Sequence, residues 1–126
     1  MVNQDIALMA HLMRRAGFGA TRDELETLVA KGYEATVDEL LDPQGQEAVD
    51  KLDLQRYQGW TWKPGTLQGM GAAEWMYFLL NTKRPLEEKM TLFWHQVFAT
   101  GVSKVDHYDE LMDQTDLFRE MGMGNY

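Results

Sequence analysis

Apolar residues recur at steps of three and four along most of the chain, the spacing that gathers side chains on one face of an α-helix. This spacing predicts helices over residues 4–16, 22–31, 34–42, 46–57, 70–82, 85–99 and 106–121. No run of alternating β-branched residues and no Asn-Gly or Asp-Gly turn accompanies them. We therefore predict an all-α protein, an irregular array of about six helices around one core.

Local signals mark several helix ends. Thr21 and Glu24 have the spacing of a capping box, in which each side chain bonds the other residue's backbone amide. Gly17 and Gly19 end the preceding helix, because glycine takes the left-handed conformation at low cost. Pro85 suits the first position of a helix, where its missing N–H is harmless. These signals predict the boundaries independently of the apolar spacing.

The helix over residues 85–99 is apolar on most sides, and a helix that is apolar nearly all round is usually buried. We therefore expect this helix to form the centre of the core, with Phe93 and Trp94 both largely buried. In the helix over 106–121, by contrast, one face is apolar and the other is acidic. The acidic face is formed by Asp106, Asp109, Glu110, Asp113, Asp116 and Glu120.

Composition narrows the functional classes. The chain has 126 residues and a formal net charge of −8, spread evenly over both halves. It therefore lacks the basic surface that nucleic acids and anionic membranes require, and we predict neither as a partner. No apolar run is long enough to span a membrane, so membrane insertion is not expected. The absence of Cys excludes thiolate chemistry, and we predict no metal site, because acidic runs are usually solvated faces.

Four segments carry a family resemblance. They are His11–Thr21 (HLMRRAGFGAT), Val37–Pro43 (VDELLDP), Arg84–His95 (RPLEEKMTLFWH) and Phe98–Thr100 (FAT). Together they resemble the N-terminal part of the bacterial domain-of-unknown-function family 1800. The resemblance implies proteins of several hundred residues, often exported, with no established activity or cofactor. It leads us to expect that residues 1–126 are a single helical region, the N-terminal fragment of a larger domain.

His95 is the most attractive catalytic candidate, because imidazole titrates near neutral pH. Glu88 lies seven residues before it on the same helical face, which corresponds to roughly 10 Å along the axis. A direct hydrogen bond between them is therefore not expected. This chain also has Val97 where members of the family commonly have a second His. The alternative interpretation is that His95 is an interior residue with a satisfied hydrogen bond.

Arg14, Arg15 and the backbone around Gly19 form a candidate anion site, because guanidinium groups and free amides both bind phosphate or carboxylate. The alternative is a purely structural helix end. In that case Arg15 binds a buried carboxylate or the carbonyls of the glycine loop, and Arg14 is more exposed.

These observations predict a helical region with no complete active site of its own. One alternative is part of an enzyme site formed by His95, Glu88 and Arg15 and completed by a missing C-terminal region. The other is an interaction module that docks a partner through its apolar surface. The expected partners are accordingly that C-terminal region or a second copy of the chain. Convergence of the three residues in one cleft would favour the enzyme, and a wide exposed apolar patch would favour docking.

The N-terminus shows no signal peptide, because it lacks a basic start followed by an apolar stretch. Residues 58–65 (QGWTWKPG) are predicted to form a loop. Trp60 and Trp62 in this loop either pack on the core or stack on a ligand.

Overall fold

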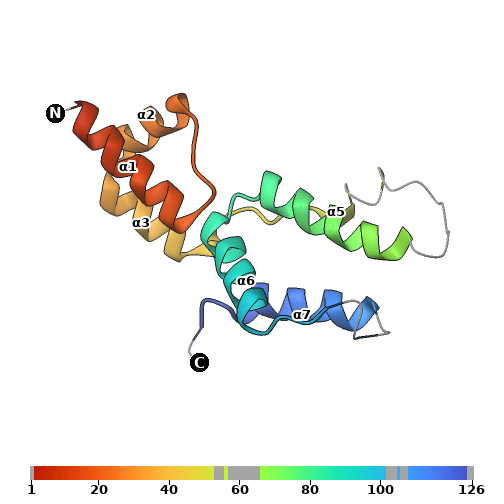
Figure 1. Ribbon diagram of the computed structural model, residues 1–126. Coiled ribbons are helices and arrows are strands. Elements are labelled where there is room, and N and C mark those ends of the chain that lie inside the picture. The colour runs from red at the N-terminus through yellow and green to blue at the C-terminus, as the bar shows by residue number, and fades with distance from the viewer. Residues whose placement is uncertain (1, 53–55, 57–65, 102–104, 106–107, 125–126) are drawn as a thin grey trace.

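The computed structural model describes residues 2–52, 56, 66–101, 105 and 108–124 (Figure 1). Its elements are α1 (Val2–Ala16), α2 (Arg22–Lys31), α3 (Tyr33–Leu41), the short 3-10 helix η1 (Pro43–Gly45), α5 (Thr66–Asn81), α6 (Pro85–Val97) and α7 (Tyr108–Met121). No strand occurs in these ranges, so the predicted all-α class is confirmed.

The predicted helix boundaries agree with these elements to within a few residues in most places. The exception is the helix over 46–57, because residues 47–50 are not helical, although residues 51, 52 and 56 are. The remainder of that segment, and the predicted loop over 58–65 with Trp60 and Trp62, lie outside the described residues.

Helices α1 and α2 share a small apolar cluster, and α3 contacts α2. Ile6 and Met9 of α1 meet Leu25 of α2, and Leu28 and Val29 pack against this cluster. The predicted capping box at the start of α2 is present, with the side chain of Glu24 accepting from the amide of Thr21 at 2.6 Å. Local signals therefore fix the turn that folds α2 back onto α1.

Helix α6 joins the two parts of the fold. Figure 1 shows α1, α2 and α3 gathered on one side of α6, and α5 and α7 on the other. Helix α6 contacts α1 and α3 as well as α5 and α7.

The residues that α6 buries are not those expected. Glu87, Glu88 and Thr91 are buried, whereas Phe93 is 49% exposed and Trp94 is only partly buried. The prediction that Phe93 and Trp94 are both core residues is therefore wrong. The apolar spacing showed correctly that α6 has several apolar faces, but the neighbouring helices leave the side of Phe93 and Val97 exposed.

Candidate functional site

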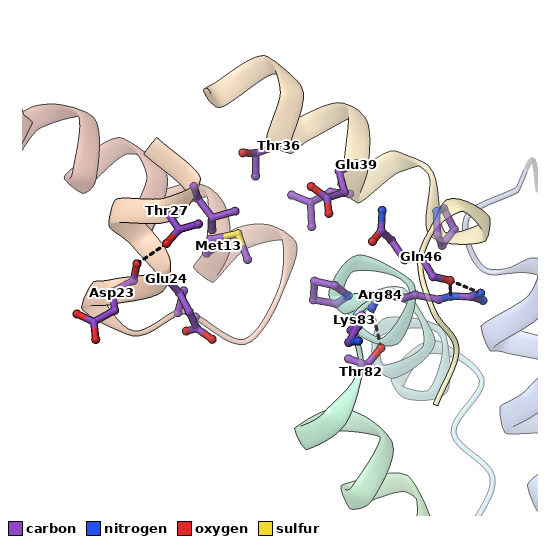
Figure 2. A pocket seen from close by; sticks show the side chains of 16 residues that line it. Met13, Asp23, Glu24, Thr27, Thr36, Glu39, Gln46, Thr82, Lys83 and Arg84 are labelled. Atoms are coloured by element: carbon purple, nitrogen blue, oxygen red, sulfur yellow. Dashed lines mark hydrogen bonds between the residues drawn. The ribbon is translucent and has the colours of Figure 1, made fainter. Parts of the chain in front are cut away.

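A large cleft lies between the first three helices and the turn from α5 to α6, and has a volume of about 600 Å³ (Figure 2). Its apolar lining includes Met13, Leu28 and Leu40 from the first group of helices and Pro85 from the start of α6. A cleft of this size is within the usual range for sites that take small ligands or apolar side chains.

The charged groups around this cleft are largely engaged with the protein itself. Arg84 donates from Nε and Nη2 to the carbonyl oxygen of Gln46, at 2.9 and 2.6 Å, as the dashed lines in Figure 2 show. Lys83 binds Glu47 at 2.5 Å. Glu39 pairs with Lys31. The cleft therefore offers an apolar concavity more than free charge for acid–base chemistry.

Glu24 lines the same cleft and belongs to the capping box. Its hydrogen bonds from the backbone amide and the hydroxyl of Thr21 lower the pKa of its carboxyl, so this group is held ionised for a structural purpose.

A buried ion pair joins α6 to α7. Glu88 is 1% exposed, and its Oε1 accepts from Nε of Arg119 at 2.5 Å. Arg119 also binds Asp116, which in turn accepts from Lys51 at 2.7 Å. The guanidinium of Arg119 stacks over Phe78, 4.3 Å from the ring centroid. Glu88 is therefore committed to holding α7, which removes it from the set of free carboxylates.

Glu87 is buried beside this pair. Burial raises the pKa of its carboxyl, because removal from water disfavours the charged form, and the nearby Arg84 acts in the opposite direction. Nη1 of Arg84 lies 3.7 Å from Oε1 of Glu87. The first turn of α6 thus carries two buried carboxylates, each next to an arginine.

His95 lies at a smaller cleft of about 210 Å³ between α5, α6 and α7, also lined by Arg119 and Thr100. Its ring stands edge-on to the indole of Trp75, with the centroids 4.8 Å apart. Within the described part of the chain, Nδ1 of His95 and Nε1 of Trp75 are buried without a hydrogen-bond partner. The interpretation of His95 as an interior residue predicted a satisfied hydrogen bond, and the described residues provide none at Nδ1.

The anion-site candidates do not come together. Arg14 and Arg15 are both exposed, and Gly19, with a positive φ of 96°, lines the large cleft without them. The C-terminal carbonyls of α1 are instead bonded by Lys89 of α6, whose Nζ lies 3.0 Å from the oxygen of Gly17. The prediction that Arg15 reaches the loop carbonyls is wrong, because a lysine distant in sequence occupies that place.

Sequence reasoning missed Lys89 and Arg119, two charged residues that connect α6 to distant parts of the chain. Arg119 had a recognisable signal, since it is the only basic residue in α7. Lys89 had none, because its partners lie 72 and 75 residues away in the chain.

The expected catalytic set is likewise divided. Among the described residues, no single cleft is lined by His95, Glu88 and Arg15 together. Arg119 is the one link, because it binds Glu88 and lines the cleft of His95. Nor does this part of the chain bring three or more His, Asp or Glu side chains into a possible metal site.

Several large apolar side chains are exposed where α6 and α7 end. Phe93, Val97 and Phe98 at the end of α6, with Leu117 and Met121 of α7, are exposed large apolar side chains. We call these five residues the α6–α7 face. A shallow groove of about 180 Å³ runs within it, lined by Trp94, Phe98, Leu117, Phe118, Met121, Gly122 and Gly124.

The fold and these features define an all-α protein in which two groups of helices share α6 and one side carries an open apolar groove. None of the described helices is long and apolar enough to cross a membrane. The model of the family described as "Protein of unknown function (DUF1800)" matches residues 11–126, and the chain belongs to this family. No curated protein and no solved structure matches the chain.

Proposed function

We propose that this chain is a helical docking module, whose α6–α7 face packs against a further helical segment. The observation that carries the proposal is the groove between two contacting helices, which the exposed apolar side chains of Phe98, Leu117 and Met121 line together. Contiguous apolar patches on a protein surface usually mark interaction sites.

The groups with potential chemistry support docking over catalysis. Glu88 is held by Arg119, and Arg15 lies on the exposed surface of α1. Because these groups serve different parts of the fold, an enzyme role would need further residues to assemble a site. In a longer chain of the family, the covering segment would be its C-terminal region, and for the isolated chain it would be a second copy.

The experiment compares the chain with the double variant Val97→Asp/Leu117→Asp. Both residues are at least half exposed, so the substitutions should leave the helix content measured by circular dichroism unchanged. We expect the parent to bind an apolar fluorescent dye and to associate in light scattering at high concentration, and the double variant to lose most of both signals.

Leu8→Asp is the matched control, because Leu8 is equally exposed but lies on α1. It should keep both signals. A monomeric parent without dye binding, or equal losses in the control and the double variant, would overturn the docking proposal.

A further inference from the structure

We infer that the segment that docks on the α6–α7 face is an amphipathic helix with basic flanks, which inserts one large apolar side chain into the groove. This inference rests on the proposed docking function and names its partner. Three features of the described residues carry it: the rigidity of the groove, its position between two helices, and the charges beside it.

The floor of the groove is fixed in place by Trp94. The indole Nε1 donates a hydrogen bond of 2.8 Å to the carbonyl oxygen of Gly122, which follows α7. A Cβ on Gly122 would lie 2.9 Å from Cδ1 of Trp94 and would clash with the carbonyl oxygen of Phe118. Glycine is therefore required for this close approach, and the indole is held before any partner arrives. Such preorganisation lowers the entropic cost of binding.

Aromatic rings continue this floor across both helices. Phe98 stacks on Trp94 and on Phe118, with centroid distances of 5.8 and 5.9 Å. The resulting surface joins the end of α6 to the end of α7. It is apolar, partly exposed, and large enough for one bulky side chain.

The geometry favours a helix as the occupant. Trp94 and Phe98 stand four residues apart at the end of α6, and Leu117 and Met121 stand four apart on α7. Both pairs line the groove, and each forms a ridge along its helix. A third helix packs well into the groove between two such ridges, with anchors at steps of three and four. Strand addition is not available in the described residues, because they contain no strand edge.

The charges beside the groove favour basic flanks. Asp113 and Glu120 are exposed and share the α7 face with Leu117, because they are four residues before it and three after it. The only basic residue of α7, Arg119, is turned inward to Glu88. With a net charge of −8, the chain attracts basic segments, whereas like charges weaken its association with a second copy at low salt.

The test uses two synthetic amphipathic helical peptides with the same Leu-rich face, one with Lys flanks and one with Glu flanks. Binding of each labelled peptide to the full chain is measured by fluorescence anisotropy. We expect the Lys peptide to bind about tenfold more tightly than the Glu peptide at low salt, and to lose most of this advantage in 0.5 M salt, since exposed charges are then screened.

Two variants locate the contact. Phe98→Ser should weaken the Lys peptide about tenfold, as removal of an aromatic anchor does. Asp113→Asn/Glu120→Gln should weaken only the Lys peptide and reduce its salt dependence. Leu8→Ser on α1 is the matched control and should change neither peptide.

The outcomes separate this inference from the docking proposal. Equal binding of the two peptides, with both weakened by Phe98→Ser, would overturn the basic partner and support docking. Tight binding of the Lys peptide that is unaffected by Phe98→Ser would overturn the groove as the site, because general attraction to an acidic chain would explain it. A dimer that strengthens with salt and excludes the peptide would replace the basic helix with a second copy.

Discussion

Arg119 of α7 donates two hydrogen bonds to the carboxylate of Glu88 on α6, from Nε to Oε1 at 2.5 Å and from Nη2 to Oε2 at 3.4 Å. The side chain of Glu88 is 1% exposed and that of Arg119 is 15% exposed. A charge this deeply buried depends on its partner, because water no longer solvates it.

Arg119→Met should therefore destabilise the chain strongly. Removing one partner of a buried pair leaves an uncompensated charge, which typically costs about 3–5 kcal/mol. Urea denaturation followed by circular dichroism measures the loss.

The double variant Glu88→Leu/Arg119→Met is the control for this prediction. It removes both charges and should recover most of the lost stability, since a well-packed apolar pair can replace a buried ion pair. A single variant within about 0.5 kcal/mol of the parent would show that the pair does not hold α6 to α7.

Lys89 and Arg15 provide a second contrast. Lys89→Met should lower the free energy of unfolding by about 1 kcal/mol, because its bonds to the carbonyls of Gly17 and Arg14 cap α1. Arg15→Lys should melt like the parent, because Arg15 is exposed. Thermal melts of the two variants measure these losses. A larger loss of stability for Arg15→Lys than for Lys89→Met would indicate that Arg15 is the cap.

The capping box of α2 gives a local prediction. Thr21→Ala removes the hydroxyl that accepts from the amide of Glu24, and loss of such a cap costs about 1 kcal/mol. Thr27→Ala, on the exposed surface of the same helix, is the control and should cost less. Chemical denaturation measures the loss of stability in both variants. A larger loss for Thr27→Ala than for Thr21→Ala would contradict the assignment of Thr21 as the cap.

Glu87 should make stability depend on pH in a defined direction. Its pKa is raised by burial, so the folded state binds a proton more readily than the unfolded state does. This contribution therefore destabilises the fold as pH rises through the interval between the unfolded and the folded pKa. Glu87→Gln removes it, so the difference in Tm between variant and parent should move in favour of the variant as pH rises from 4 to 7, in roughly the range where carboxyls titrate. A difference that is constant with pH would show that Glu87 titrates normally.

Phe93 and Phe78 test where the core lies. Phe78 is 5% exposed, and Phe78→Ala should cost about 3–5 kcal/mol. Phe93 is 49% exposed, so Phe93→Ala should cost only about 1 kcal/mol. Urea titrations of the two variants measure the change in unfolding free energy. Equal losses would indicate that Phe93 is a core residue.

Most helices and their approximate ends follow from the sequence alone, with the predicted helix over 46–57 as the exception. The capping box at Thr21 and the proline at the start of α6 were predicted and are present. These features depend only on residues within one or two helical turns of each other, so a short segment of sequence is enough to predict them.

The tertiary structure alone decided which faces are covered and which charges meet. Glu88 and Arg119 lie 31 residues apart, and Lys89 reaches α1 across more than 70 residues. Helical periodicity shows that α6 has apolar sides, but it carries no information about which side a distant helix will cover. The helices that contact α6 cover the side of Glu88 and Thr91 and leave Phe93 and Val97 about half exposed, because burial depends on the packed neighbours and not on the segment itself.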